Sequence, residues 1–377
     1  MRQKEYFGFN SISKLKEIID IESPSKIFLV TGKSSYEKSG AKDKIENILK
    51  GNIDYQIFND FSNNPKYTDL RKGISKFKSE EFDMIIAIGG GSVIDMAKSI
   101  NILAKQDHPP EKYILKQKKL ADKSIPLCAI PTTSGTGSEA THFSVIYYNE
   151  TKYSLANQNI FPDYVVLDPE LTFSLSEYIT ASTGMDALCQ AVESYWSVNS
   201  TEKSKKFAEK AIKILLKNIN ETVNNPGKLN RKKMMLGANY AGKAINISKT
   251  TAPHAFSYIV TSKCNVPHGH AVSLFLGEIL IHNSELDQNE IVDYRGKEYV
   301  RGVVNDINQF FYSLNSKEAR DNIYELMINI GLETSLSKLC KDVKVKDLIE
   351  GVNQERLKNN PVYINNIREI FNRIIAF

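Results

Sequence analysis

Residues 87–98, AIGGGSVIDMAK, join a short apolar run to a segment with helical spacing. The run before them, Phe82–Ile88, predicts a strand covered on both faces. Gly89 to Ser92 would then present bare backbone N–H groups at a helix start, where an anion such as phosphate is favoured. Glycines also suit a tight turn without any ligand. The motif is neither G-x-G-x-x-G nor a P-loop, so this stretch alone leaves both interpretations open.

The composition is that of an ordinary globular protein of 377 residues, which is long enough for two domains. No run of eighteen apolar residues occurs and the first ten residues lack an apolar signal core, so we expect a cytoplasmic protein that does not enter a membrane. The net charge of +5 gives weak grounds for a nucleic-acid partner. Without C-x-x-C spacing, Cys128, Cys189, Cys264 and Cys340 are predicted to be reduced thiols.

Strand and helix patterns alternate through the first half of the chain. Apolar runs at Lys26–Thr31, Tyr55–Phe58, Phe82–Ile88 and Pro126–Ile130 predict strands of a parallel sheet covered by helices. The last of these runs leads into PTTSGTGSE, residues 131–139, a second loop rich in glycine and hydroxyl groups. Two such loops at strand carboxyl ends would line the crevice where open α/β sheets bind ligands.

Beyond residue 178 the strand signals mostly stop. We therefore predict an α/β domain over residues 1–178 and a helical domain over residues 179–377. Helical spacing occurs at Met185–Tyr195, Ser204–Leu216, Arg231–Ile247, Ala271–His282, Val300–Phe311, Lys317–Ile330 and Asn365–Ile375.

Candidate metal ligands occur in the helical half. Asp186 and Gln190 are four residues apart and so share a helix face. Three of the six histidines, His254, His268 and His270, fall within seventeen residues. A carboxylate with two imidazoles can hold Zn²⁺ or Fe²⁺ and leave a coordination position open. The alternative is that Asp186 caps a helix and that the histidines are ordinary core or surface groups.

The motifs GGGSVIDMAK, PTTSGTGSE, GMDAL and PHA…NVPHG, in this order and at these separations, resemble those of the iron-containing alcohol dehydrogenases. That family shares its fold with glycerol dehydrogenase and dehydroquinate synthase. The resemblance implies a dinucleotide-binding α/β domain followed by an all-α metal-binding domain. It also implies cofactor contacts from Gly89, Gly90, Gly91, Ser92, Asp95, Thr132, Thr133, Ser134 and Lys152, and metal ligation by Asp186, His254 and His268.

Two positions depart from the family pattern. The family usually has a fourth ligand, histidine, four residues after the aspartate, where this chain has Gln190; we expect three protein ligands plus water, or a weak bond from Gln190. Four residues after His254, where many members have a second histidine, this chain has Tyr258. His270 is a candidate substitute for that histidine as a proton-transfer group, the alternative being an exposed histidine at a helix start.

The cofactor preference is predicted from Thr31-Gly32-Lys33-Ser34-Ser35, which follows a predicted strand. NAD-preferring relatives carry an aspartate there, which bonds the ribose 2′-hydroxyl. Gly32 removes that carboxylate, while Lys33 and Ser34 offer donors to a 2′-phosphate. We expect NADPH to be preferred, with use of NADH as the alternative.

The expected activity is reversible reduction of a small aldehyde, with the metal as Lewis acid and the nicotinamide as hydride donor, in a cleft between the two domains. The segments around GMDALCQAVESYWS and KTTAPHAFSYIVTSKCNVPHGHAVSL look most like the branch that reduces phosphonoacetaldehyde to 2-hydroxyethylphosphonate. Lys249, Lys263, His270 and Tyr258 are candidate donors to such an anion.

Three alternatives remain open. The first is an uncharged aldehyde, lactaldehyde or diol as substrate. The second is a lyase of the dehydroquinate synthase type, and the third is a non-enzymatic nucleotide-binding protein. Apart from the small-molecule substrate, no nucleic-acid or membrane partner is expected, and a homodimer remains open.

Overall fold

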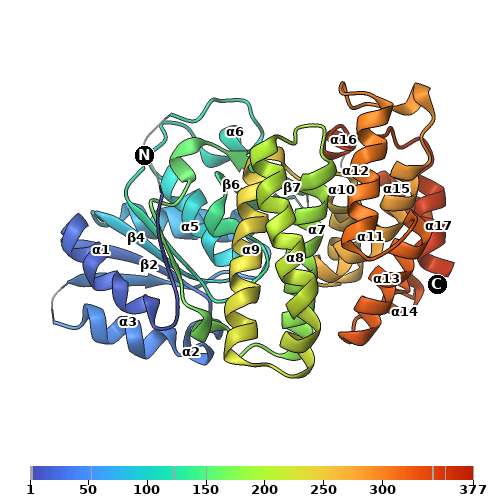
Figure 1. Ribbon diagram of the computed structural model, residues 1–377. Helices are drawn as coiled ribbons and strands as arrows, with labels where there is room; N and C mark the ends of the chain where they lie inside the picture. The colour runs from blue at the N-terminus through green and yellow to red at the C-terminus, as the bar shows by residue number, and fades with distance from the viewer. Residues whose placement is uncertain are drawn as a thin grey trace. The chain divides into compact units, whose positions relative to one another are not determined.

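The computed structural model describes residues 3–51, 53–121, 124–149, 151–341, 344–352 and 354–376. The chain forms two compact units, Met1–Leu175 and Ser176–Phe377 (Figure 1). The boundary expected after residue 178 falls just inside the first helix of the second unit, α7 (Glu177–Trp196).

A six-stranded, wholly parallel sheet forms the centre of the first unit, in the order β1-β8-β5-β4-β2-β3. This confirms the predicted parallel α/β fold. Its strands are β1 (Lys4–Phe7), β2 (Lys26–Thr31), β3 (Asp54–Phe58), β4 (Met84–Gly89), β5 (Leu127–Pro131) and β8 (Tyr164–Leu167).

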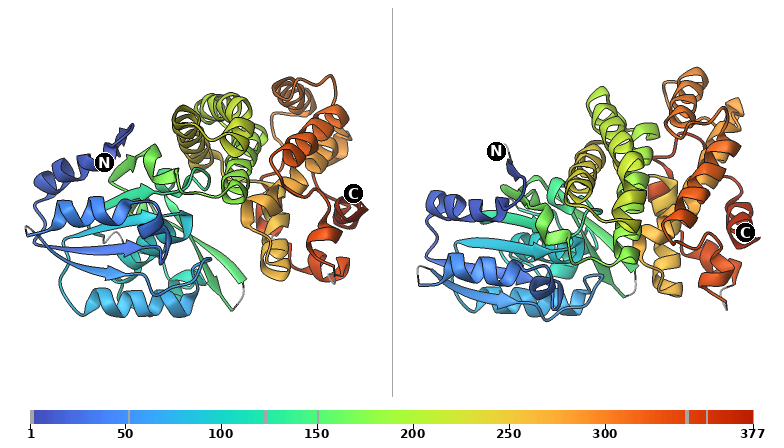
Figure 2. Two further views of the ribbon diagram at one scale, coloured as in Figure 1. Left: turned by 90° about the horizontal axis from the view of Figure 1, so that it is seen from below. Right: turned by 60° about the horizontal axis from the view of Figure 1, so that its bottom comes forward.

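Helices cover both faces of this sheet (Figure 2). Because side chains alternate along a strand, Ile27 and Leu29 of β2 pack with Ile12, Leu15 and the inner side of α3. The next residue along, Phe28, faces the other way and packs against the rings of Phe58, Phe77 and Phe82. The helices of this unit are η1 (Ser11–Lys14), α1 (Leu15–Glu22), α2 (Ser35–Lys38), α3 (Ala41–Leu49), α4 (Tyr67–Lys78), α5 (Gly91–Leu103), α6 (Pro110–Ile114), η2 (Ser138–Ala140), η3 (Gln158–Ile160) and η4 (Pro169–Thr172).

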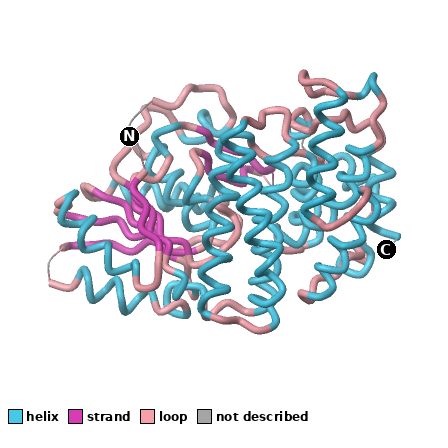
Figure 3. Tube along the Cα trace, in the orientation of Figure 1, coloured by secondary structure: helices cyan, strands magenta, loops and turns pink. Residues whose placement is uncertain are grey.

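A two-stranded antiparallel hairpin, β6 (Phe143–Tyr148) and β7 (Thr151–Ala156), stands apart from the parallel sheet (Figure 3). The sequence patterns predicted neither the strand β6 nor an antiparallel pairing. One of its residues is Lys152, a predicted cofactor contact, which pairs with Tyr147 across the hairpin.

The second unit is helical, as predicted (Figure 1). Besides three short helices near the C-terminus, the patterns missed one long helix, α10, because its side chains are buried almost all round and show no single apolar face. The elements after α7 are α8 (Glu202–Asn224), α9 (Lys228–Ser248), α10 (Ala252–Cys264), α11 (His268–Ser284), η5 (Gln288–Glu290), α12 (Lys297–Phe310), α13 (Ser316–Asn329), α14 (Leu336–Leu339), α15 (Val345–Glu350), α16 (Gln354–Leu357) and α17 (Ile367–Ala376).

The prediction of four reduced thiols is wrong for two of them. Cys264 and Cys340 form a disulfide between the end of α10 and the end of α14, with 5.4 Å between their Cα atoms. Cys128 and Cys189 are free and buried. The spacing of cysteines along the chain could not reveal this pair, because 76 residues separate its members and only folding brings them together.

Among the described residues, no helix is both long enough and apolar enough to cross a membrane.

Candidate metal centre and nucleotide-binding edge

The direction of strand addition reverses between β2 and β4. After β2 the chain adds β3 on one side, and from β4 it adds β5 and β8 on the other. Open parallel sheets bind ligands outside the strand carboxyl ends at such a switch point. Gly32 follows β2, Gly89 ends β4 and Thr132 follows β5, so three of the predicted cofactor segments lie along this edge.

Backbone hydrogen bonds tie the three segments together. Gly32 N donates to Ile88 O at 3.4 Å, and Thr132 N donates to Gly89 O at 3.0 Å. Gly89 has a φ of +158°, and a Cβ there would lie 2.4 Å from Val93 Cγ2. This position therefore requires glycine for a steric reason as well as for any ligand.

The two glycine-containing loops also pack on each other. A Cβ on Gly91 would lie 2.6 Å from Thr136 Oγ1, and one on Gly90 would lie 3.5 Å from Thr133. Residues Gly90 and Gly91 open α5, whose N-cap, Gly90, offers no side-chain hydrogen bond to the helix start. The backbone N–H groups at that end of the helix can therefore face an anionic ligand.

Some of the predicted cofactor residues make hydrogen bonds to other parts of the first unit. Ser92 Oγ accepts from Asn64 N at 3.2 Å. Asp95 accepts from Ser138 Oγ at 2.5 Å and from Val145 N at 3.1 Å, so it links α5 to the second loop and to β6. Burial raises the pKa of Asp95, and the charges of Lys98 and Lys152 are among the effects that oppose the rise. Lys152 therefore lies within electrostatic reach of Asp95.

Lys98, the last residue of the opening motif, was given no role from the sequence. It is completely buried, and its Nζ donates to Thr141 O at 2.7 Å, to Phe143 O at 3.0 Å and to the carbonyl of Ser138. Burial lowers the pKa of Lys98 to about 8, against the opposing charges of Asp95 and Glu139. Its contacts fix the end of the second loop against α5.

Asp186, His254 and His268 converge within the second unit. They come from α7, α10 and the first position of α11, and one ligand atom from each lies within 4.8 Å of the others. Asp186 and His254 are buried, with Oδ1 of the first 3.3 Å from Nε2 of the second. His268 is half-buried, and its ring centroid lies 5.2 Å from that of His254.

This geometry fits a divalent metal. Metal–ligand bonds of about 2.1 Å at tetrahedral angles separate ligand atoms by about 3.4 Å, close to the observed 3.3 Å. One carboxylate and two imidazoles are also a donor set that Zn²⁺ and Fe²⁺ accept. No other group of three such side chains converges in this way among the residues that the structure describes.

Glu193 orients His254, a role that the sequence patterns did not reveal. Its fully buried carboxylate hydrogen-bonds Nδ1 of His254 and accepts from Thr251 N at 2.6 Å. Nε2 of His254 is thereby left to face Asp186. The available signal was spacing, because Asp186, Gln190 and Glu193 stand at i, i+4 and i+7 on one face of α7.

Gly269 allows His268 to approach Asp186. A Cβ on Gly269 would lie 2.0 Å from the backbone oxygen of Ser182 and 2.7 Å from Asp186 Cβ. In the same contact, His270 N donates to Ser182 Oγ at 3.2 Å. The start of α11 can pack this closely on α7 only without a side chain at position 269.

Gln190 and Tyr258, the two departures from the family pattern, both lie at this centre. Burial by itself raises the pKa of the Asp186 carboxyl. The net shift is nevertheless downward, because hydrogen bonds from His254 and Gln190 and the charges of His268 and His254 together outweigh the effect of burial. Gln190 thus contacts the carboxylate of Asp186. The ring of Tyr258 stacks on His268, with 5.8 Å between centroids and 27° between planes.

His270 is not an exposed histidine at a helix start, so that alternative is wrong. It is 1% exposed, its Nε2 lies 2.7 Å from Glu333 O, and its Nδ1 lies 3.1 Å from the Tyr178 hydroxyl. Burial lowers the pKa of His270. Both ring nitrogens have partners within the helical unit, and the ring is not part of the converging metal cluster.

The two lysines suggested as anion ligands are both exposed. Lys249 caps the end of α9 with a φ of +62°, and Lys263 lies in the last turn of α10, nine residues beyond His254. At about 1.5 Å per residue, that places Lys263 about 13 Å along the helix from His254.

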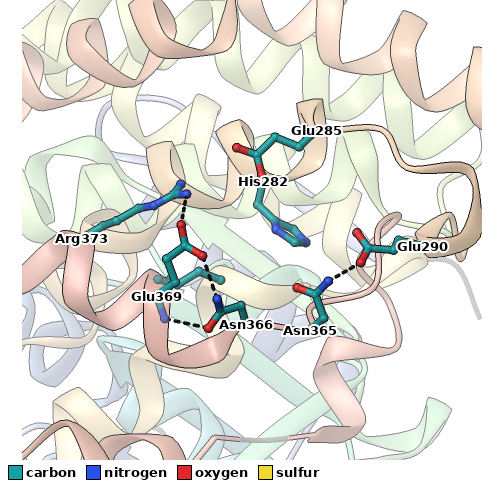
Figure 4. A pocket seen from close by; sticks show the side chains of 8 residues that line it. His282, Glu285, Glu290, Asn365, Asn366, Glu369 and Arg373 are labelled. Carbon is teal, nitrogen blue, oxygen red and sulfur yellow. Dashed lines mark hydrogen bonds and ion pairs between the residues drawn. The ribbon is translucent and has the colours of Figure 1, made fainter.

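A polar pocket in the C-terminal part of the chain offers no comparable site (Figure 4). Several of its polar groups are already paired with one another or with the backbone. Glu369 binds Arg373 at 2.5 Å, Glu290 accepts from Asn365, and His282 Nε2 lies 3.0 Å from Tyr363 O. The pocket is lined by His282, Glu285, Glu290, Asn365, Asn366, Glu369, Ile370 and Arg373.

Family models match both units. Residues 3–169 match the iron-containing alcohol dehydrogenase model, and residues 180–374 match the C-terminal model of the Fe-containing alcohol dehydrogenase family. Aldehyde-alcohol dehydrogenase 2 of Entamoeba histolytica is 34% identical over 299 residues, which are 75% of this chain and 34% of that protein. The chain thus spans about a third of the length of that relative.

Two further relatives are more similar in length to this chain. The 1,3-propanediol dehydrogenase of Klebsiella pneumoniae is 28% identical over 347 residues, covering 91% of this chain and 87% of the relative. The phosphonoacetaldehyde reductase of Streptomyces viridochromogenes is 33% identical over 232 residues, covering 59% and 58%.

A solved structure agrees over almost the whole chain. The sulfoacetaldehyde reductase of Bifidobacterium kashiwanohense, determined with NAD⁺, superposes with a TM-score of 0.86 at 28% identity, covering 99% of this chain and 97% of that one. The predicted resemblance and fold class are therefore confirmed. This chain belongs to the iron-containing alcohol dehydrogenase family.

Proposed function

We propose that this protein is a metal-dependent, NAD(P)H-linked reductase of small aldehydes that also catalyses the reverse oxidation of the alcohol. The convergence of Asp186, His254 and His268 is the observation that carries the proposal. The first unit, with glycine loops at the switch point of its sheet, would bind the dinucleotide. The lyase and the non-enzymatic alternatives are less favoured, because the relatives compared above are named dehydrogenases and reductases.

Asp186, His254 and His268 would hold the metal as Fe²⁺ or Zn²⁺. A bound divalent ion supplies a Lewis acid that polarises a carbonyl oxygen. Glu193 keeps the Nε2 lone pair of His254 directed at the site, and Gln190 steadies the carboxylate of Asp186. We propose that these three residues are the protein ligands and that Gln190 acts through Asp186.

NADPH is the proposed cofactor, with NADH as the alternative. The end of β2 carries Gly32 rather than an acidic residue, so this position itself adds no repulsion against a 2′-phosphate. Lys33 and Ser34 beside it are exposed, and Lys33 pairs only loosely with Asp60 at 3.7 Å, an exposed contact that contributes little. Lys33 can therefore turn to an incoming phosphate.

The proposed substrate is a small aldehyde that carries an anionic group, with phosphonoacetaldehyde as the best candidate. The named activities of the relatives in Streptomyces viridochromogenes and Bifidobacterium kashiwanohense support an anionic aldehyde. The named activity of the Klebsiella pneumoniae relative supports the alternative, an uncharged aldehyde or diol.

The proposed activity is tested by oxidation of NADPH with phosphonoacetaldehyde and with butanal, using protein reconstituted with Fe²⁺ or Zn²⁺. Chelation should abolish turnover, and metal addition should restore it. His268→Ala should abolish turnover but leave NADPH binding within about threefold of wild type. Full activity after verified metal removal would contradict the proposal.

A further inference from the structure

Arg356 hydrogen-bonds the chain segment just before α10, the helix that carries the proposed metal ligand His254. It lies on the short helix α16, and its Nη1 donates to Thr250 Oγ1 at 3.0 Å. Thr250 is buried and stands four residues before the metal ligand His254. No sequence pattern pointed to Arg356, which is 102 residues from His254 along the chain.

Contacts on both sides of Arg356 hold its chain segment in place. After the arginine, Asn359 Nδ2 donates to Thr250 O at 3.1 Å, and Val198 N donates to Asn359 O at 3.1 Å. Before it, a Cβ on Gly351 would lie 2.3 Å from Ile259 Cδ1. The backbone on both sides of Arg356 is therefore held in place, and this fixes the position from which its guanidinium group extends.

Tyr258 connects this arginine to the metal centre. Its ring stacks on that of the metal ligand His268, and its phenol hydrogen-bonds with Thr250. Burial raises the pKa of Tyr258, and the positive charge of Arg356 is the largest effect that opposes the rise. The side chains from His268 through Tyr258 and Thr250 to Arg356 thus form one continuous set.

The charges of the residues at the metal centre indicate why a positively charged side chain is needed beside it. Asp186 and Glu193 together bring two negative charges, which a divalent ion would only balance. The formal charges of the metal and the two carboxylates therefore sum to zero, so together they add little long-range attraction for an anionic substrate. A guanidinium beside the centre supplies the missing positive charge, and its planar fork suits a tetrahedral oxyanion.

We propose that Arg356, with the hydroxyl groups of Thr250 and Tyr258, binds a tetrahedral anionic group, phosphonate or sulfonate, at the far end of the aldehyde substrate. This inference rests on the proposed function, because it assumes that the carbonyl end of the substrate lies at the metal centre. It makes Arg356 the residue that selects charged over neutral aldehydes.

The first test measures binding without turnover. Calorimetric titration of the Zn²⁺-loaded protein with ethylphosphonate and with ethanesulfonate should give measurable affinity for at least one anion. Arg356→Gln should weaken that affinity on the order of 100-fold, and Arg356→Lys should lose less, because it keeps the charge but not the fork. Lys358→Gln is the matched control, since Lys358 is an exposed cation two residues further on; it should change affinity less than about twofold.

The proposal is overturned if neither anion binds, or if Arg356→Gln binds both as tightly as wild type while its metal content and melting temperature are unchanged. Comparing the two anions shows whether the site prefers a dianion or a monoanion. Either preference supports the proposal, provided that it depends on Arg356.

Kinetics separate this inference from the proposed function. Arg356→Gln should raise KM for the anionic aldehyde on the order of 100-fold while leaving kcat/KM for butanal within about threefold. Equal losses on both substrates would overturn the role of Arg356 but leave the reductase intact. If wild type reduces no aldehyde with either cofactor, the proposed function fails, and the binding experiment alone then decides whether the anion site exists.

Discussion

The carboxylate of Glu193 hydrogen-bonds Nδ1 of His254, on the side of the ring opposite to Asp186. Both side chains are buried, and Thr251 holds the carboxylate by its backbone N and its hydroxyl. Trp196 Nε1 in turn donates to Thr251 Oγ1 at 2.7 Å. The tautomer and the direction of His254, a proposed metal ligand, are thus set by residues outside the cluster of Asp186, His254 and His268.

Glu193→Gln should therefore weaken metal binding. The amide can still contact His254 but no longer supports its Nε2 lone pair with a negative charge, so Zn²⁺ affinity should fall about 10- to 100-fold. Competition titration with a chromophoric chelator measures this change. Glu221→Gln, an exposed carboxylate on α8, is the control. An unchanged affinity in Glu193→Gln would mean that the hydrogen bond only supports the fold.

Gly269→Ala should damage the metal centre and the packing of α11 on α7. The new Cβ would meet the Ser182 carbonyl oxygen at 2.0 Å, and backbone cannot move aside cheaply. We expect a loss of about 1–3 kcal/mol in unfolding free energy and a lower metal content. Gly302→Ala is the matched control, because nothing lies within 4 Å of its Cβ and it stands within helix α12. That control should be neutral or stabilising by up to about 1 kcal/mol. Equal melting temperatures for both variants would contradict the close approach.

The stability of the metal-free protein should depend on His254. Burial lowers the pKa of this imidazole, but Glu193 and Asp186 outweigh burial, so the pKa lies above its ordinary value of 6.5. A raised folded-state pKa gives a stabilisation that is complete below the unfolded-state value and is lost as pH rises through the folded-state value. Metal-free protein should therefore lose part of its unfolding free energy as pH rises from about 6.5.

Metal binding should reverse this dependence, because the ion needs the neutral imidazole. Below the raised pKa, Zn²⁺ affinity should weaken by up to about tenfold per pH unit. Denaturant titrations of metal-free and Zn²⁺-saturated protein from pH 6 to 9 measure both effects. His254→Gln should remove the decline from the metal-free series. If it leaves the decline unchanged, another group is responsible.

Gly32→Asp should shift cofactor preference from NADPH toward NADH, because the new carboxylate repels a 2′-phosphate and can accept from a 2′-hydroxyl. Its Cβ would lie 2.1 Å from the Ser35 hydroxyl, which can rotate away, and at ordinary contact distance from Ser35 Cβ (3.4 Å) and Val93 Cγ2 (3.6 Å). Gly32→Asn is the matched control with the same size and no charge. Michaelis constants for both cofactors provide the measurement. If wild type already uses NADH at an equal or lower Michaelis constant, the predicted preference is wrong.

Loss of the Cys264–Cys340 disulfide should destabilise the second unit. Cross-linking residues 76 positions apart restricts the unfolded chain, a contribution of about 4.5 kcal/mol in the chain-entropy model. Cys340→Ser should lower the melting temperature, and reductant should lower that of wild type similarly. Reductant should then have no further effect on Cys340→Ser. A reductant effect that persists in this variant would point to another cause.

The sequence by itself determined the local parts of this protein. Apolar strands that end in glycine-rich loops predicted the parallel sheet and its ligand-binding edge, because strand, loop and helix are contiguous there. Helical spacing over Met185–Tyr195 placed Asp186 and Gln190 on one face of a helix. In each case the informative sequence pattern lies within about a dozen residues. The geometry of a single strand or helix is then enough to say which side chains share a face.

Only the tertiary structure decided which distant residues meet. Helix α10 escaped prediction because it is buried on nearly all sides, yet it carries His254 and Tyr258. The pairing of Cys264 with Cys340, the burial of His270 and the approach of Arg356 to Thr250 all join residues 63 to 106 positions apart. Such contacts depend on the packing of whole helices, as at Gly269 against Ser182, and side-chain packing of that kind leaves no periodic trace in the sequence.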